Sequence, residues 1–360
     1  METPRDPPQD QPRDLPQRKI VVPAGGIGAA RFLRGLLAAT QGVGAAGQTA
    51  EITVIGNTGD DITLFGLRVC PDLDTVMYTL GGAVHEGQGW GREDETFVVK
   101  EELAAYGVGP AWFGLGDRDI ATHVVRTQML GAGFPLGQVT EALCARWGFP
   151  GLGVRLLPMS DDRVETHVVI DDAAAPGGRR AAHFQEYWVR LRAEPAAHEV
   201  VAVGAETAAA GPGVLEAIAD ADLVLLPPSN PVVSIGTVLA VPGVRDALAA
   251  TKAPVVGLSP IVGGAPVRGM ADKVLAAVGV ESTADAVALH YGARSAGGLL
   301  DGWLMDSADA SAVGRVEEAG IACRAVPLLM PDVGRAAAMA RAALDLAAGL
   351  GELASAPGRA

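Results

Sequence analysis

The feature that most constrains the fold is a short apolar run that leads directly into a glycine-rich turn and a helix-like segment. Ile20 to Val22 is the run, Gly25-Gly26-Ile27-Gly28 is the turn, and apolar residues then recur at helical spacing from Ala29 to Ala39. Such a unit binds phosphate groups in dinucleotide folds, because glycines let the backbone approach the anion and free N–H groups face it at the helix start. It predicts an α/β fold in which Gly25, Gly26 and Gly28 hold a phosphorylated ligand.

The turn departs from the pattern G-x-G-x-x-G at its last position, where Arg31 stands. The acidic residue that would bind a nicotinamide ribose is also missing, because Gly56-Asn57 follows the second predicted strand, Ile52 to Ile55. Glycine-rich turns between a strand and a helix also occur for packing alone. We interpret this one as a nucleotide or diphosphate site, and we rank an NAD-dependent dehydrogenase low.

Strand-like and helix-like segments alternate along most of the chain. They predict a Rossmann-like α/β fold, with a mostly parallel sheet, helices on both faces and a smaller, mainly helical insert. We expect a disordered tail at residues 1–18, a single domain at 19–350 with a helical or lid-forming insert at about 80–195, and a frayed end at 351–360. Further strands are expected at Val154–Pro158, Thr166–Ile170, Leu223–Leu226, Val255–Leu258 and Ala322–Val326, and further helices at Leu73–Leu80, Thr96–Tyr106, Leu136–Trp147, Gly213–Ala219 and Val333–Ala348.

Four carboxylates, those of Asp60, Asp61, Asp72 and Asp74, lie in two short loops between Gly56 and Thr75. One arginine and no lysine stand among them, so the acids would repel one another. A hard divalent cation with oxygen ligands would remove that repulsion. The alternative is that Asp60 and Asp61 cap a turn or a helix. Two acidic pairs beside strand and turn signals favour a site.

Two further segments carry candidate ligand groups. Asp117 or Asp119 is expected to cap a helix that carries His123 and, three residues later, Arg126. His123 alone would suit a satisfied buried imidazole, but together with neighbouring arginines it indicates an anionic ligand. In Pro228-Ser229-Asn230-Pro231, Ser229 and Asn230 follow a strand and precede a helix, so they predict either an N-cap or, as we prefer, a ligand site.

The glycine-rich segment Gly81–Gly91 could close over a ligand. His183–Arg192 concentrates aromatic and basic residues in a chain that is poor in both. It could form an amphipathic surface element, a subunit contact or a lid over a planar substrate, and the sequence does not separate these three.

Charge and cysteine content exclude several classes of function. The formal net charge is −14 and no cluster of Lys and Arg is present, so nucleic acid is not an expected partner. The three cysteines are far apart and lack metal-binding spacing, which favours buried free thiols. No signal core and no apolar run long enough to cross a bilayer occurs, so we predict a cytoplasmic protein without a membrane partner.

Six short motifs resemble, in their order along the chain, those of the 2-phospho-L-lactate transferase family, called CofD in archaea and FbiA in actinobacteria. They are Gly25-Gly26-x-Gly28, Asn57-Thr58-Gly59-Asp60-Asp61, Pro71-Asp72-Leu73-Asp74-Thr75, Gly116-Asp117-Arg118-Asp119-x-Ala121-Thr122-His123, Pro228-Ser229-Asn230-Pro231 and Gly269-Met270-Ala271-Asp272. The similarity covers about Lys19 to Gly349. The segments Met77–Gly82 and His183–Glu186 look like the actinobacterial branch.

The resemblance implies a step in the biosynthesis of the deazaflavin coenzyme F420. A guanosine diphosphodiester would transfer its phosphoenolpyruvyl or 2-phospho-L-lactyl group to the ribityl hydroxyl of the deazaflavin FO, which gives dehydro-F420-0 or F420-0 and GMP. The actinobacterial branch implies the enolpyruvyl donor, and we expect a homodimer. The alternative is a non-catalytic regulatory protein of a related fold that binds a nucleotide sugar. Binding of FO together with release of GMP would distinguish the two.

For this reaction we predict Mg²⁺ held by Asp60 and Asp74, with Asp61 or Asp72 orienting the ligands or accepting the hydroxyl proton. The glycine turn and Ser229-Asn230 would hold the guanosine diphosphate, and Arg118 and Arg126 would offset charge near the acid end. The predicted catalytic residues are Asp60, Asp61 and Asp74, and the predicted substrate-binding residues are Gly25, Gly26, Gly28, Asn57, Asp72, Thr75, Arg118, His123, Arg126, Ser229, Asn230, Gly269 and Met270.

Overall fold

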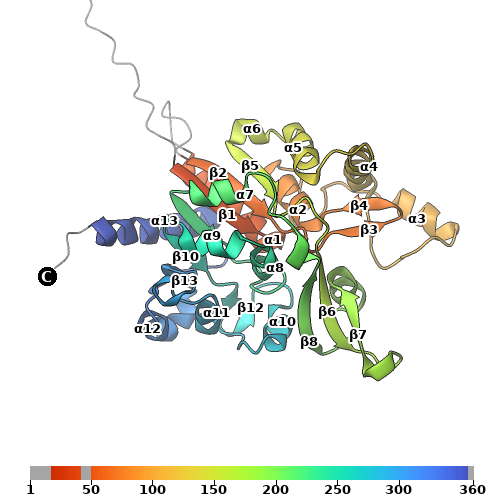
Figure 1. Ribbon diagram of the computed structural model, residues 1–360. Coiled ribbons are helices and arrows are strands. Elements are labelled where there is room, and N and C mark those ends of the chain that lie inside the picture. The colour runs from red at the N-terminus through yellow and green to blue at the C-terminus, as the bar shows by residue number, and fades with distance from the viewer. Residues whose placement is uncertain (1–17, 42–49, 356–360) are drawn as a thin grey trace, which may run out of the picture.

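The computed structural model describes residues 18–41 and 50–355, which form a parallel seven-stranded sheet enclosed by helices (Figure 1). The strands lie in the order β14-β13-β10-β9-β1-β2-β5, and every neighbouring pair runs parallel. This confirms the predicted Rossmann-like α/β class. The strands are β1 Arg18–Ala24, β2 Ala50–Gly56, β5 Val154–Pro158, β9 Leu223–Leu226, β10 Val255–Leu258, β13 Gly302–Met305 and β14 Ala322–Ala325.

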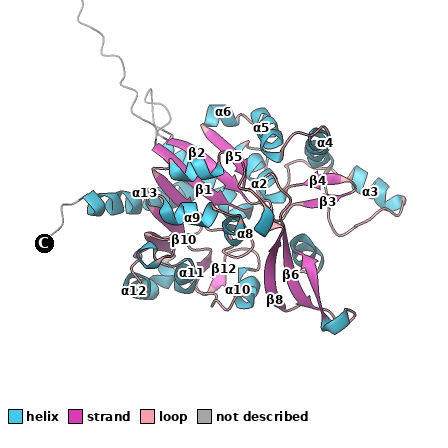
Figure 2. Ribbon diagram, in the orientation of Figure 1, coloured by secondary structure: helices cyan, strands magenta, loops and turns pink. Residues whose placement is uncertain are grey.

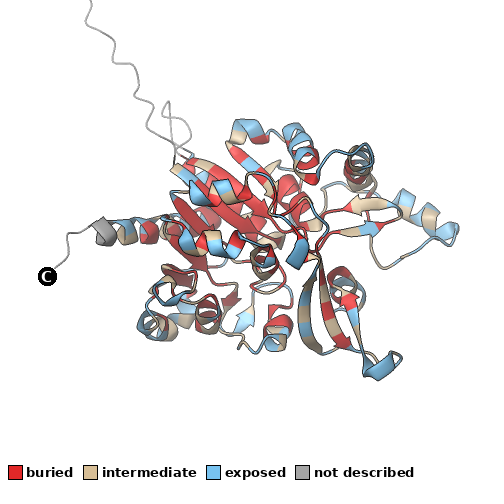
Figure 3. Cartoon of the chain, viewed as in Figure 1, coloured by how far each residue is buried: buried red, intermediate tan, exposed pale blue. Residues whose placement is uncertain are grey.

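Each strand presents alternate residues to two hydrophobic cores, one on each face of the sheet. Helices surround the sheet (Figure 2), and its strands are mostly buried (Figure 3). In β1, Ile20 and Val22 belong to one core and Val21 to the other. The first face is covered by α1 Gly26–Thr40, α2 Pro71–Leu80, α5 Leu136–Arg146 and α13 Val333–Ser355. The second face is covered by α7 Val214–Ala219, α8 Ile235–Ala240, α9 Val244–Ala250, α11 Ala284–Tyr291 and α12 Val313–Glu318.

The order of the strands places a topological switch point between β1 and β9. From β1 the chain proceeds outward through β2 to β5, and it then returns to the other side of β1 to form β9 and the strands beyond it. The segments that follow β1 and β9 therefore diverge to opposite faces of the sheet. In open α/β sheets ligands bind at such a crevice, outside the carboxyl ends of the strands.

The region expected as a helical insert at about 80–195 is helical only in its first part. Helices α3 Val98–Ala105, α4 Asp117–Gly131, α5 and α6 Phe149–Leu152 precede β5, which belongs to the central sheet. Next follows an antiparallel sheet of β6 Glu165–Asp171, β7 Arg179–His183 and β8 Ala197–Val203. Buried residues alternate along β6, a two-residue period that fits a half-buried strand. The structure also contains two short hairpins and a further helix. The hairpins are β3 Ile62–Leu64 with β4 Leu67–Val69 and β11 Ile261–Val262 with β12 Ala265–Pro266, and the helix is α10 Ala271–Ala277.

Several element boundaries differ from the sequence predictions. Helix α1 begins at Gly26, three residues before the expected start, because the glycine turn is itself helical. Strand β13 was not predicted. Helix α13 continues to Ser355. The expected tail lies outside the described residues except for Arg18, which begins β1, and residues 356–360 of the expected frayed end also lie outside them.

The cap predicted for the His123 helix is wrong. Asp117 accepts hydrogen bonds from the N–H groups of Val98 and Val99, at 3.0 Å each, and therefore caps α3. Glu95 in turn accepts from the N–H groups of Arg118 and Asp119 at 2.8 Å each, so it caps α4. The two helix starts exchange caps, a pairing that depends on their packing and not on local sequence.

Candidate active site

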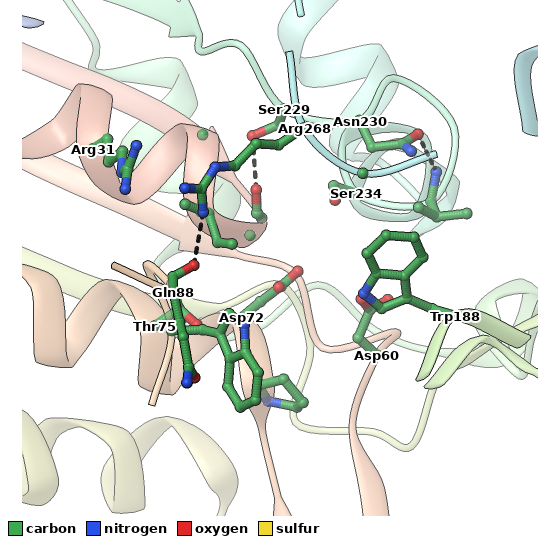
Figure 4. Close-up of a pocket in the computed structure, with 18 of the residues that line it drawn as sticks. Arg31, Asp60, Asp72, Thr75, Gln88, Trp188, Ser229, Asn230, Ser234 and Arg268 are labelled. Atoms are coloured by element: carbon green, nitrogen blue, oxygen red, sulfur yellow. Dashed lines mark hydrogen bonds between the residues drawn. The ribbon is translucent and has the colours of Figure 1, made fainter. Parts of the chain in front are cut away.

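A pocket of about 1010 Å³ opens at the carboxyl ends of the sheet, over the switch point (Figure 4). Its wall comes from the glycine turn, the start of α2, the loop after β9 and the start of α10. Three more distant segments complete it: Gln88–Gly91, Phe184–Arg192 and Leu328–Pro331 all contribute lining residues. A pocket of this size at this position matches the ligand sites of doubly wound folds.

The glycine turn packs directly against the loop after β9. The Ser229 hydroxyl donates a hydrogen bond to the carbonyl of Gly25 at 2.8 Å. A Cβ atom at Gly28 would lie 2.1 Å from the carbonyl oxygen of Pro228, so only glycine fits there. The Asn230 side chain accepts from the N–H groups of Val232 and Val233, at 2.9 and 3.2 Å. Asn230 therefore caps the turn before α8, whose own N-cap is Ser234. Ser229 and Asn230 line the pocket, and their role as ligands stays a prediction.

Two buried carboxylates, those of Asp60 and Asp72, face the pocket on either side of one amide. Asn57 Nδ2 donates to Asp72 Oδ2 at 2.8 Å and to Asp60 Oδ1 at 3.2 Å. Burial, with the charge of Asp72 added, raises the pKa of Asp60 well above its usual value. Burial raises the pKa of Asp72 to about 6, although hydrogen bonds from Asn57 and from the Gly26 N–H oppose this. Within the described part of the chain no cationic side chain lies within ion-pair distance of either carboxylate.

Asp74, by contrast, is neutralised by protein. Arg126, which is 1% exposed, forms an ion pair with Asp74 through its two terminal guanidinium nitrogens, Nη1 and Nη2. Arg126 Nη1 also lies 3.1 Å from Nδ1 of His123, and Nε2 of His123 lies 3.2 Å from Asp119 Oδ2. Oxygen and nitrogen atoms of Asp74, Asp119 and His123 lie close enough together to hold a metal ion. Nδ1 of His123 thus has Arg126 as a hydrogen-bond partner, whereas Nε2, although 3.2 Å from Asp119 Oδ2, forms no hydrogen bond with a described residue.

Asp61 lies behind the pocket wall. Its carboxylate accepts from Arg68 Nη2 at 2.9 Å and from the Cys70 thiol at 3.0 Å, and its side chain has no exposed surface. Burial raises the pKa of Asp61 to about 6, against the opposing charge of Arg68. Its carbonyl oxygen lies 3.2 Å from Nε2 of His183. Asp61 thus supports the wall where the β3–β4 hairpin meets β7.

The structure brings most of the predicted site residues into one pocket. Those that line it are Gly25, Gly26, Gly28, Asp60, Asp72, Asp74, Thr75, His123, Ser229, Asn230, Gly269 and Met270. Asn57, Asp61 and Arg126 are buried outside the lining, and Asn57 and Arg126 bond to the lining residues Asp72 and Asp74. Arg118 is exposed and lies outside the pocket, where its carbonyl accepts from Arg92 at 3.3 Å. The Arg118 side chain therefore does not line the pocket that Asp60, Asp72 and Asp74 line.

Several pocket residues were not predicted as ligands. In Figure 4 Arg31 and Arg268 lie toward one side of Asp72, and Trp188 lies toward the other side. In the sequence Arg31 stands out only as the residue that departs from the glycine pattern. Trp188 belongs to the aromatic segment 183–192, which contains the π-helical turn Glu186–Arg190. Of the three interpretations left open for that segment, a covering over the pocket fits its position. The glycine-rich segment 81–91 likewise reaches the pocket, through Gln88 and Trp90.

Comparison with known proteins identifies the family. The family model "2-phospho-L-lactate transferase CofD" matches residues 20–325. The chain belongs to this family. A phosphoenolpyruvate transferase of Streptomyces griseus is 71% identical over 91% of this chain and 98% of its own length. Proteins of the same name from Thermobifida fusca and Mycolicibacterium smegmatis are 64% and 57% identical, and they cover 93% and 91% of this chain and 99% and 98% of their own lengths.

Membership of the family makes the chain an enzyme, a transferase of coenzyme F420 biosynthesis. A solved structure of a UPF0052-family protein from Bacillus halodurans has the same fold, with a TM-score of 0.56 over 92% of this chain and 99% of its own, at 16% identity. Among the described residues no helix combines the length and apolar character that crossing a bilayer requires. The cytoplasmic location and the homodimer stay predictions.

Proposed function

We propose that this enzyme transfers the phosphoenolpyruvyl group of a guanosine diphosphodiester to the ribityl hydroxyl of FO, which yields dehydro-F420-0 and GMP. A 2-phospho-L-lactyl donor would give F420-0 by the same chemistry. The names of the relatives from Streptomyces griseus and Thermobifida fusca favour the enolpyruvyl donor.

One observation carries the proposal: the glycine turn and an unneutralised acidic pair open into the same pocket at the switch point. Arginine side chains lie on one side of this pair and Trp188 lies on the other (Figure 4). The basic side suits a diphosphate, because guanidinium groups and helix N–H groups both bind phosphate oxygens. The aromatic side suits the planar ring system of a deazaflavin, since flat ligands stack on aromatic side chains.

Within this proposal Mg²⁺ keeps Asp60 as a ligand, but its partner is Asp72 in place of the predicted Asp74. Asp60 and Asp72 share one amide donor and lack a cationic partner among the described residues, so two hard oxygen ligands there fit a divalent cation. The negative charge of Asp74 is instead matched by Arg126. Bound Mg²⁺ would offset the negative charge of the diphosphate.

The side chains would then position the reactants and move one proton. A carboxylate oxygen of Asp60 or Asp72 is proposed to accept the proton of the ribityl hydroxyl. The hydroxyl oxygen bonds to the phosphorus nearer the organic acid, in line with the phosphorus–oxygen bond to GMP, and that bond breaks as GMP leaves. Cys70 is no candidate for a covalent intermediate, because it is buried and burial raises its pKa well above the usual value. Direct transfer is therefore favoured.

The test is a product analysis with purified protein, Mg²⁺, FO and each candidate donor in turn. The proposal predicts that FO gains the enolpyruvyl phosphate and that GMP appears in equal amount. Asp60→Asn should reduce kcat at least about 100-fold, because it removes a group that acts in the transition state. A wild-type enzyme that leaves FO unmodified with every donor would refute the proposal.

A further inference from the structure

The loop Glu86–Gly89 covers the entrance to the glycine turn. Gly89 is buried, has a φ of +77°, and would place a Cβ atom 2.7 Å from Cγ2 of Ile27. The same Cβ would lie 3.4 Å from Arg268 Nη1 and 3.5 Å from Arg31 Nη2. The two guanidinium groups therefore flank one glycine directly above the start of α1.

Main-chain carbonyls of this loop accept hydrogen bonds from both Arg31 and Arg268. Arg31 Nη2 donates to the Glu86 carbonyl at 3.2 Å, and Arg268 donates to the Gln88 carbonyl at 2.7 Å and the Gly87 carbonyl at 3.4 Å. The Glu86 carboxylate pairs with Arg34 instead. Among the residues that the structure describes, neither Arg31 nor Arg268 has a carboxylate within ion-pair distance. Burial and the charge of Arg268 lower the pKa of Arg31, and the charge of Glu86 opposes this only in part.

We propose that Arg31 and Arg268 form a clamp for the diphosphate of the donor, whose oxygens replace the loop carbonyls. Both side chains line the pocket beside the glycine turn (Figure 4). Arg31 lies one helical turn after Ile27 in α1. A phosphate carries a negative charge and can accept two parallel hydrogen bonds from one guanidinium group, whereas a main-chain carbonyl is neutral, which favours the exchange. The clamp rests on the proposed function for the identity of its ligand.

Calorimetric titration of the full chain with GDP tests the clamp without requiring turnover. Arg31→Ala and Arg268→Ala should each weaken GDP binding about 10-fold or more, since each removes a charge-assisted contact. Arg34→Ala is the matched control, because Arg34 lies on the same helix and holds the same loop but pairs with the Glu86 carboxylate. We expect this variant to change GDP affinity less than about twofold. Hydrogen exchange of residues 86–91 should rise when GDP binds to the wild type, because the loop loses its arginine contacts.

If the arginines only hold the loop, Arg31→Ala and Arg268→Ala would raise exchange of residues 86–91 while GDP affinity stays unchanged, and this result overturns the clamp. Equal weakening by Arg34→Ala would overturn it as well. A different result would refute the transferase proposal. A wild type that binds GDP through the clamp but never modifies FO refutes the reaction, whereas normal turnover by Arg31→Ala with unchanged donor KM refutes only the clamp.

Discussion

Asp72 and Asp74 stand two residues apart in the first turn of α2, and replacing each by asparagine should change stability in opposite directions. Asp72 has an acidic neighbour, Asp60, whereas Asp74 has Arg126. Asp72→Asn removes a buried negative charge from the metal-free protein, and Asp74→Asn leaves a buried positive charge unmatched. Both substitutions keep the size of the side chain, so packing changes little.

The size of the Asp72 effect follows from its pKa. A native pKa of about 6, against an ordinary 3.8, corresponds to about 3 kcal/mol of unfavourable free energy once the group is ionised. The native state keeps a proton that the unfolded chain has released between about pH 4 and pH 6, so the stability of the metal-free protein falls as pH rises through that window. The loss of a carboxylate at a helix N-terminus subtracts up to about 1 kcal/mol. Asp72→Asn should therefore stabilise the metal-free protein by about 2 kcal/mol at pH 7.5.

Asp74→Asn should destabilise by about 3 kcal/mol, because removing one partner of a buried ion pair leaves the other charge desolvated. Urea unfolding of chelator-treated protein at pH 7.5, followed by circular dichroism, measures both free energies. Despite its added stability, Asp72→Asn should lose nearly all transferase activity. A fall in stability for both variants would refute the assignment of Asp60 and Asp72 as an unneutralised pair.

Three other predictions follow from the same contacts. Mg²⁺ should raise the melting temperature more at pH 8 than at pH 5 in thermal unfolding, because protons compete for Asp60 and Asp72 at the lower pH; equal shifts would contradict this. Trp188→Ala should raise KM for FO about tenfold by loss of stacking and leave GDP affinity unchanged in calorimetry; an unchanged KM would count against the aromatic side as the FO site. Gly28→Ala should destabilise by about 2 kcal/mol or more, because its Cβ meets the Pro228 carbonyl at 2.1 Å; a variant with wild-type urea stability would show that the turn can yield.

Much of the sheet was predictable because its strands are short apolar runs with polar or proline-containing ends. Leu223–Leu226 and Val255–Leu258 were predicted with the bounds that the structure gives. Strand β13, Gly302–Met305, was missed, since four residues without alternation do not separate a buried strand from other buried segments. In the antiparallel sheet, β6 was predicted as Thr166–Ile170, whereas β7 and β8 were missed. Strand β7 has one buried residue and β8 has none.

The acidic site was predictable as a cluster, but the partner of each acid was not. Residues two apart on a helix point in nearly opposite directions, so Asp72 and Asp74 face different neighbours once α2 forms. Arg126, which pairs with Asp74, is 52 residues away along the chain. Arg268 reaches the Gln88 carbonyl across 180 residues. No spacing in the sequence encodes contacts of that range.

In the proposed reaction the FO hydroxyl attacks the phosphorus nearer the organic acid. Asp60 and Asp72 hold Mg²⁺, one of them accepts the proton there, and the glycine turn binds the diphosphate. A single-turnover reaction with enzyme in excess over the enolpyruvyl donor, quenched and resolved by mass, shows which phosphorus is attacked. We expect dehydro-F420-0 and GMP in equal amounts. FO carrying the GMP group, together with free phosphoenolpyruvate, would contradict the claim.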